Sequence, residues 1–367
     1  MKKNLFLLLL VLPFTPALSQ NSPDKQKAQE LKQEAVRLMD NGDPDKAIDL
    51  LNAAQKADPD NYVYLYEIGY AWIIKKDYPK AIETFRKTTR YSDVTDQCYQ
   101  MLGNAYDYNG ERSKAREAYA EGLKKFPSAG RLYMESGLLD QADENYDHAV
   151  LLWEKGIEVD PNYPSNYYRL AKLFAQTNER IWAALYGELF INLERGTDRT
   201  QEMSRILFNV YKRSITMPSD TSKSLKLDMT SSTINYDPKK EFKIPFRLAF
   251  TMYLITGLSP AALDSTHKNE VTIALLNKAR VIFIDIWFNQ KKLDQQYPNV
   301  LLGFQRMLNE KGWLEAYNYW LLMKGDEQEF IKWRDSHSDT WDAFFTWFKD
   351  NPLHLDTSHL FIRTQYN

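Results

Sequence analysis

Hydrophobic and small residues recur every 34 positions through the first half of the chain. Five rows of this length start at residues 28, 62, 96, 130 and 164, with no insertion between them. The eighth residue of each row is small: Ala35, Gly69, Gly103, Gly137 and Ala171. The twentieth residue is always alanine: Ala47, Ala81, Ala115, Ala149 and Ala183. Each row holds two amphipathic runs around a turn. A fixed period of this length predicts stacked helical hairpins.

The other conserved columns of the rows fit the same hairpin. Turns such as Asn41-Gly42-Asp43-Pro44 place glycine where a helix ends and positive φ is needed. Proline follows the second helix in several rows, because it lacks an N–H and cannot continue a helix. A bulky residue recurs in the second helix, and we expect it to fill the gap to the next hairpin: Leu51, Phe85, Tyr119 and Trp153.

These columns resemble the tetratricopeptide repeat (TPR), a family with a 34-residue unit and the same small, alanine, aromatic and proline positions. The resemblance covers residues 28–197, about half the chain. It implies an all-α fold in which a helical-hairpin solenoid of about five repeats precedes the second half. The fifth row departs from the pattern, with Gly187 at a bulky position and Phe190 at a small one. We interpret this hairpin as altered to dock onto another part of the chain.

In this family the first helices of successive repeats line a groove that receives a peptide or protein segment. Carried over position by position, the groove residues are Tyr66, Tyr70, Ile73, Gln100, Met101, Asn104, Tyr108, Arg131, Met134, Tyr168, Arg169 and Lys172. Such a surface suits an extended peptide with apolar anchors and an acidic residue near its basic end. The alternative is that individual members only pack between hairpins.

One subclass of the family grips the terminal carboxylate of its partner with basic and amide side chains. The corresponding positions here hold Val36, Glu67 and Met101. Because Glu67 would repel a carboxylate, we do not expect this chain to bind C-terminal tails in that manner.

The second half is also predicted to be mainly helical. Residues 198–216 form an amphipathic helix that caps the array, residues 217–240 form a linker or β-hairpin, and residues 241–367 form a helical, tryptophan-rich domain. In the hairpin alternative, a strand at 225–229 pairs with 233–236. The apolar run 272–290 predicts a buried helix, and shorter helices follow at about 297–310, 313–323, 326–336 and 339–350.

Two sequence segments, EAYNYWLLMKGDEQEF and WDAFFTWFKDNPL, resemble the C-terminal portion of some exported bacterial tetratricopeptide-repeat proteins. That resemblance implies no activity. Within the first segment, Asp326 and Glu329 have the spacing of a helix capping box. The tryptophans clustered between Trp313 and Trp347 allow two interpretations, a helical core or an aromatic platform for a carbohydrate or small apolar ligand. The helical spacing of the aromatic residues favours the core.

The N-terminus has the pattern of a secretory leader. A short basic start precedes an apolar run of about ten residues, and small residues follow at 17–19. We expect cleavage near Ser19, so residues 1–19 are a signal peptide and the chain is exported to the periplasm or secreted. No later segment is apolar enough to predict a transmembrane helix.

Composition narrows the candidate functions. The 47 basic and 49 acidic residues provide no basic excess, so nucleic acid is not an expected partner. A single cysteine, Cys98, excludes an internal disulfide. No nucleophile, nucleotide-loop or metal-ligand motif stands out, so we predict no catalytic residues, no cofactor and no metal site. The resulting hypothesis is an exported, non-enzymatic scaffold for a protein or peptide; carbohydrate or small-ligand binding is the alternative. The sequence leaves the oligomeric state open.

Overall fold

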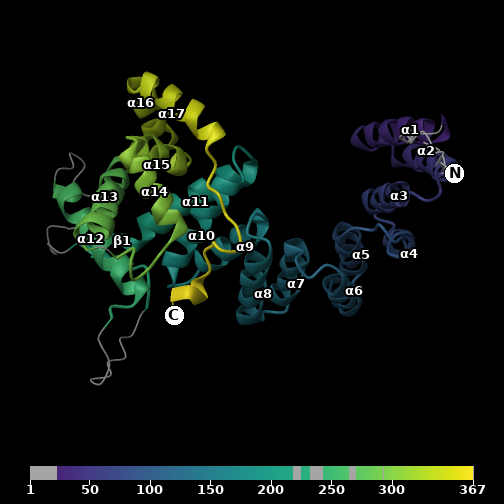
Figure 1. Ribbon diagram of the computed structural model, residues 1–367, viewed down its shortest axis with the longest axis horizontal. Coiled ribbons are helices and arrows are strands. Elements are labelled where there is room, and N and C mark those ends of the chain that lie inside the picture. Colours follow the sequence, from purple (N-terminus) through teal and green to yellow (C-terminus); the bar gives the residue numbers. More distant parts are fainter. Residues whose placement is uncertain (1–22, 218–224, 232–242, 264–269, 292, 367) are drawn as a thin grey trace, which may run out of the picture. The chain divides into compact units, whose positions relative to one another are not determined.

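The structure, a computed structural model, describes residues 23–217, 225–231, 243–263, 270–291 and 293–366. The leader predicted at 1–19 lies outside these residues. The described chain is all-α apart from one two-stranded antiparallel sheet, which confirms the predicted fold class (Figure 1). It divides into two compact units: unit 1 ends at Glu111 and unit 2 begins at Arg112. The boundary falls inside the 34-residue rows, and the fourth and fifth hairpins share a unit with the C-terminal helices.

Unit 1 consists of two helical hairpins and the first helix of a third. Its helices are α1 (Pro23–Asp40), α2 (Pro44–Ala57), α3 (Val63–Ile74), α4 (Tyr78–Thr88) and α5 (Asp96–Tyr108). Gly42 adopts a φ of +82° in the α1–α2 turn, and the Asp43 side chain accepts the Lys46 N–H at the start of α2. Glycine and aspartate therefore occupy the positions that helix C- and N-termini favour.

The bulky column packs within its own hairpin, which differs from the expectation that it fills the gap to the next one. In α3, a Cβ placed on Gly69 would lie 2.7 Å from the Phe85 ring of α4. In the fourth row, Gly137 lies under Trp153, whose indole N–H donates to the Met134 carbonyl at 3.0 Å. The small first-helix position thus makes room for the aromatic ring of the partner helix.

Unit 2 continues the hairpins and adds a further first helix. Its array helices are α6 (Arg112–Lys125), α7 (Gly130–Ala142), α8 (Tyr146–Val159), α9 (Pro164–Phe174), α10 (Arg180–Leu193) and α11 (Asp198–Ser214). Helices α7, α9 and α11 begin 34 residues apart, so α11 takes the first-helix position of a sixth row.

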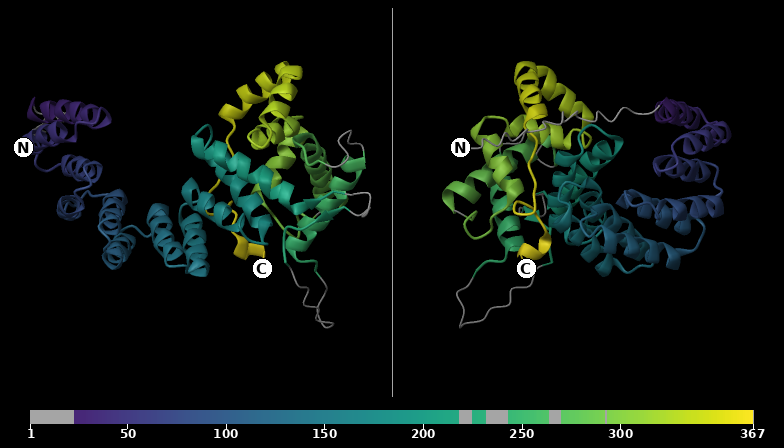
Figure 2. Two further views of the ribbon diagram at one scale, coloured as in Figure 1. Left: turned by 180° about the vertical axis from the view of Figure 1, so that it is seen from behind. Right: turned by 45° about the vertical axis from the view of Figure 1, so that its right-hand side comes forward.

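The C-terminal helices follow the small sheet. They are α12 (Phe246–Leu263), α13 (Ile273–Asp285) with a π-helical end at Ile286–Gln290, α14 (Val300–Glu310), α15 (Leu314–Leu322), α16 (Glu327–Ser336) and α17 (Ser338–Asp350). In both views of Figure 2, α16 and α17 (yellow) lie at one end of unit 2.

The observed sheet pairs strands other than those of the predicted hairpin. Strand β2 (Lys226–Leu227) pairs with β1 (Ile215–Thr216), directly after α11. The expected partner, 233–236, lies outside the described residues. The apolar pattern of α11 runs on into Ile215, so the sequence offers no separate signal for β1.

The fifth hairpin is buried along its second helix. Every residue of α10 from Ile181 to Asn192 is buried. Gly187, the unusual residue of this row, faces Leu207 and Met203, so a Cβ on Gly187 would lie 2.8 Å from the Leu207 side chain. Glycine therefore lets α11 approach α10 closely. On its other sides α10 belongs to one continuous core that extends through the C-terminal helices.

A buried polar network fastens α10 to those helices. The Glu188 carboxylate accepts hydrogen bonds from Arg280 of α13 (2.7 Å), Gln305 of α14 (2.6 Å) and Tyr317 of α15 (2.8 Å). Glu188 and Arg280 are 2% and 4% exposed. Burial disfavours the charge on Arg280, but Glu188 outweighs it and raises the Arg280 pKa. An ion pair this deep is retained only when its remaining donors and acceptors are satisfied.

The C-terminal tail runs back over the array. In Figure 1 it is the yellow chain that leaves α17 and passes α9. Asn162 donates to the Leu355 carbonyl at 3.0 Å, and Arg363 pairs with the buried Glu154 of α8 at 3.1 Å. Tyr366 stacks on Phe246 of α12, with ring centroids 4.2 Å apart. The tail therefore links the fourth hairpin to the C-terminal helices.

The predicted capping box at α16 is only half formed. Asp326 accepts the Glu329 N–H at 2.9 Å, as expected for an N-cap. The Glu329 carboxylate instead accepts the backbone N–H groups of Ile273 and Ala274, both at 2.7 Å. It caps α13, a helix more than fifty residues earlier, because the free N–H groups and positive dipole end of that helix attract a carboxylate.

Candidate functional site

The candidate site is the surface formed by the first helices of the rows, and it is described separately for each unit. In unit 1 this first-helix face lies on α3 and α5 and holds seven of the predicted groove residues: Tyr66, Tyr70, Ile73, Gln100, Met101, Asn104 and Tyr108. Tyr70 and Tyr108 are the most exposed, at 43% and 53%. Tyr66 is half-buried, packs edge-on against Phe85 and accepts a hydrogen bond from Gln97 at 2.7 Å.

The first-helix face of unit 2 holds the other five: Arg131 and Met134 on α7, and Tyr168, Arg169 and Lys172 on α9. Met134 and Tyr168 are buried, at 7% and 6% exposed, so their side chains belong to the packing between helices. Arg131, Arg169 and Lys172 are partly exposed. The polar members of the set, rather than its apolar members, therefore form the surface in unit 2.

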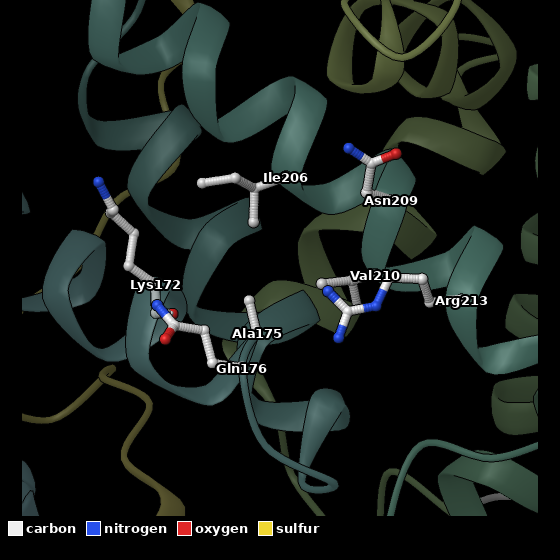
Figure 3. Close-up of a pocket in the computed structure, with 7 residues that line it drawn as sticks. All are labelled: Lys172, Ala175, Gln176, Ile206, Asn209, Val210 and Arg213. Atoms are coloured by element: carbon white, nitrogen blue, oxygen red, sulfur yellow. Dashed lines mark hydrogen bonds between the residues drawn. The ribbon is translucent and has the colours of Figure 1, made fainter.

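A pocket of about 200 Å³ lies between α9 and α11 on this face. Its lining residues are Lys172, Ala175, Gln176, Ile206, Asn209, Val210 and Arg213. Figure 3 shows Lys172 and Gln176 on the α9 side, Asn209 and Arg213 on the α11 side, and Ala175 and Ile206 between them. An apolar floor with a polar and basic rim is the usual form of a binding site for a side chain.

A small ion-pair cluster borders the pocket. Lys172 donates to Glu202 of α11 at 2.8 Å and to the Tyr168 hydroxyl at 3.2 Å, and the Tyr168 hydroxyl donates to Glu202. Burial alone would raise the pKa of Glu202, but hydrogen bonds from Lys172 and Tyr168 hold it below its usual value. The same contact with Glu202 raises the pKa of Lys172. Lys172 is thus held as a cation beside the pocket.

Among the described residues, Arg169 of α9 and Arg205 and Arg213 of α11 form no ion pair, although the charge of Arg169 helps to lower the pKa of Glu202. The Arg169 Nε is buried and has no hydrogen-bond partner there. Arg205 and Arg213 are exposed on α11, two turns apart. At the rim itself, Lys172 pairs with the Glu202 carboxylate, whereas no described carboxylate pairs with Arg213.

The sequence reasoning missed the α11 side of this pocket. It ended the repeats at residue 197 and interpreted 198–216 as a capping helix that continues the stack, but it did not carry the groove positions onto that helix, which left Ile206, Asn209 and Arg213 out of the groove. The signal was present: Asp198 stands 34 residues after Pro164, at the start of a sixth row. Continuing the register would have placed α11 among the groove-lining first helices.

The aromatic residues of the second half mostly form core. Tyr317, Trp320, Trp333, Phe344 and Phe348 are all less than a tenth exposed. Their rings pack in a continuous cluster, with Trp320 and Phe348 centroids 4.8 Å apart. Among the larger rings, Phe345 stays 43% exposed and stacks on Trp341. Of the tryptophans between Trp313 and Trp347, Trp320 and Trp333 are buried, and Trp313, Trp341 and Trp347 are partly buried and pack against the same core.

The described residues offer little for metal or redox chemistry. No group of three or more His, Cys, Asp or Glu side chains among them could hold a metal ion. His354 and His359 instead contact Asp356 in an exposed turn, at 3.6 and 3.1 Å. Cys98 is fully buried in α5, and burial raises the pKa of its thiol. None of the described helices combines the length and apolarity needed to cross a membrane.

Comparison with known proteins agrees with the repeat pattern. The family model of the tetratricopeptide repeat matches residues 33–93 and 101–167. Residues 33–93 and 101–167 are therefore tetratricopeptide repeats, which confirms the repeat expected from the 34-residue period. Tetratricopeptide arrays bind protein partners and are generally not enzymes.

Individual relatives are distant. Over 128 residues, the chain is 29% identical to photosystem I assembly protein Ycf3 of Synechococcus sp. (strain CC9902), covering 30% of this chain and 72% of that protein. It is 26% identical over 124 residues to the general transcriptional corepressor trfA of Dictyostelium discoideum, covering 33% and 9%. Among solved structures, MamA shares 22% identity over 46% of this chain and 92% of its own, with a TM-score of 0.36. The pilF protein of Pseudomonas aeruginosa shares 17% over 52% and 85%, with a TM-score of 0.42.

Proposed function

We propose that this protein is an exported, non-catalytic scaffold that binds a segment of a partner protein on the first-helix faces of its array. The observation that carries the proposal is the exposure of large apolar side chains on α3 and α5. Tyr70, Ile74 and Tyr108 are each at least 39% exposed. The repeat places Tyr108 at the same position of its row as Ile74, so the exposure recurs with the 34-residue period.

Exposed aromatic and aliphatic side chains cost solvation free energy in the free protein, and a partner that covers them recovers it. Tyrosine suits such a surface because its ring is apolar and its hydroxyl stays hydrogen-bonded. The basic rim of unit 2 adds selectivity for the charge of the partner. No catalytic group is needed for this role, and recognition depends on shape and charge alone.

Site-specific photo-crosslinking in the producing cell tests the proposal. The photoreactive residue p-benzoylphenylalanine replaces Tyr70 or Tyr108 on the first-helix face, and as a matched control Tyr146, which is 46% exposed on the second helix α8. We expect the same discrete adduct from both first-helix positions and little from the control. Equal adducts from all three positions, or none from Tyr70 and Tyr108, would overturn the proposed binding face.

Export is part of the proposal and has its own test. The N-terminal pattern supports a cleaved leader, so the protein recovered from the producing cell should begin near Gln20. Mass spectrometry of its intact chain measures this directly, and cell fractionation shows its compartment. A cytoplasmic chain that retains residues 1–19 contradicts export and leaves the binding face unaffected.

A further inference from the structure

Resting on the proposed function, we infer that the α9–α11 pocket receives one aliphatic side chain of an acidic segment of the partner protein. The lining of the pocket thus indicates which types of residue the bound segment carries. Three observations support it: the apolar floor, the charge of the rim, and the absence of aromatic rings from the lining.

The floor selects an aliphatic side chain. Ala175, Ile206 and Val210 present hydrocarbon to a space of about 200 Å³. At about 30 Å³ for each liquid water, that space would otherwise hold several waters against an apolar surface. Displacing them with a leucine- or methionine-sized side chain is favourable because the floor offers those waters few hydrogen-bond partners.

The rim selects negative charge beside that side chain. Arg213 and Lys172 lie on opposite sides of the pocket (Figure 3). Arg205 lies one turn before Asn209 on the same exposed face of α11. Glu202 is already engaged by Lys172 and Tyr168, and no other described carboxylate forms an ion pair with Arg205 or Arg213. Carboxylates flanking the anchor would pair with them, whereas lysines would meet like charge.

The same features disfavour a nucleic acid as the occupant. Single-stranded nucleic acids are held by aromatic side chains on which bases stack, together with a basic groove. The described residues that line this pocket include no aromatic side chain. A protein segment with one apolar anchor between acidic residues matches both the floor and the rim.

The test uses the mature chain and a fluorescein-labelled, C-terminally amidated peptide, Gly-Ser-Asp-Glu-Leu-Glu-Asp-Ser-Gly, with fluorescence anisotropy as the readout. One comparison peptide has alanine in place of leucine, and a second has lysine in place of every acidic residue. A third places leucine at a free C-terminus, which separates side-chain carboxylates from a terminal one. We expect the first peptide to bind about tenfold or more tighter than the alanine and lysine versions.

Three variants of α11 locate the binding. Arg213→Glu reverses charge at the rim, Asn209→Trp fills the pocket mouth, and Lys212→Glu makes the same charge change on a neighbouring residue outside the lining. All three positions are exposed, so the fold should be retained, and thermal unfolding checks this. We expect Arg213→Glu and Asn209→Trp to weaken peptide binding about tenfold, and Lys212→Glu to change it less than about twofold.

Several results would overturn the inference: no binding of the leucine peptide by the wild-type chain, equal binding of the alanine peptide, or equal loss in Lys212→Glu and Arg213→Glu. Tighter binding of the free C-terminal leucine peptide would also overturn it, because the rim would then recognise a chain end rather than flanking side-chain carboxylates. The crosslinked adduct at Tyr70 and Tyr108 separates the two proposals. If that adduct persists while the peptide tests fail, only the proposed role of the pocket is rejected. If the adduct is absent, the proposed scaffold function is rejected.

Discussion

The hairpins of unit 1 and the fifth hairpin of unit 2 are built on the same repeat, but they bury different chemistry. In unit 1 the cores are small clusters of alanine, leucine and isoleucine with a few larger side chains such as Tyr64 and Phe85, and charged pairs such as Asp43–Lys46 lie on the surface. In α10 of unit 2 even the carboxylate of Glu188 is inside, held by side chains from three other helices. The repeat pattern specifies a pair of helices, whereas the helices packed around that pair determine which of its surfaces are buried.

The largest expected effect tests this contrast at the buried ion pair. Arg280→Met keeps most of the side-chain volume but leaves the Glu188 carboxylate buried without its cation. We expect unit 2 to lose about 3–5 kcal/mol of unfolding free energy, the usual cost of breaking a buried pair. Denaturant unfolding measures the loss, and hydrogen exchange assigns it to α10 and α13.

Two control variants sharpen that result. Lys46→Met removes one partner of a surface pair in unit 1, where solvent already screens the charge, so its effect should be slight. Glu188→Gln combined with Arg280→Met removes both buried charges and should recover part of the loss. If Arg280→Met proves as mild as Lys46→Met, the network does not hold the C-terminal helices to α10.

A smaller effect is expected where helices approach through glycine. A Cβ on Gly257 of α12 would lie 2.5 Å from the backbone oxygen of Ala279 in α13. A backbone atom cannot relieve such a contact by changing rotamer, as a side chain can. Gly257→Ala should therefore cost about 1–3 kcal/mol. Gly303→Ala is the matched control, because nothing lies within 4 Å of its added Cβ. It should gain about 0.5–1 kcal/mol from helix propensity. Equal effects in thermal unfolding would exclude close packing of α12 on α13.

The repeat could be predicted because its contacts are local. Gly69 meets Phe85 and Gly137 meets Trp153, each pair 16 residues apart within one hairpin, so one row of sequence contains both partners. The 34-residue period then repeats the same contacts, and the all-α class follows from it.

The docking of the second half could not be predicted in the same way. Arg280 and Glu188 form an ion pair although they are 92 residues apart in the sequence, and neither residue belongs to a repeating column. Glu329 has the spacing of a local capping box yet caps α13, because only the folded structure brings that helix end near. Of the candidate site, the α3 and α5 residues followed from the register. Met134 and Tyr168 lie buried because the neighbouring helices cover them.

The smallest expected effect concerns a carboxylate of unit 1 that lacks the partners Glu188 has. Glu67 of α3 is half-buried, and no described residue donates a hydrogen bond or forms an ion pair with its side chain. Burial raises its pKa above the usual 4.5, and the charge of Lys32 only partly opposes this. Because the folded-state pKa is raised, folding disfavours the ionised form. Stability is therefore lost as pH rises from about 4.5 through the folded-state pKa.

Glu67→Gln should accordingly raise the melting temperature of unit 1 slightly at pH 7, and the gain should vanish below pH 4.5, where both states are protonated. Glu83→Gln in α4 is the control of opposite sign. A hydrogen bond from Lys87 lowers the pKa of Glu83, so its carboxylate stabilises the fold above the usual pKa, and the variant should be slightly less stable at pH 7. Thermal unfolding at pH 4 and pH 7 compares the two. If both variants shift in the same direction at pH 7, then burial of an unpartnered carboxylate is not what distinguishes Glu67 from Glu83, and the contrast with the fully partnered Glu188 loses its energetic basis.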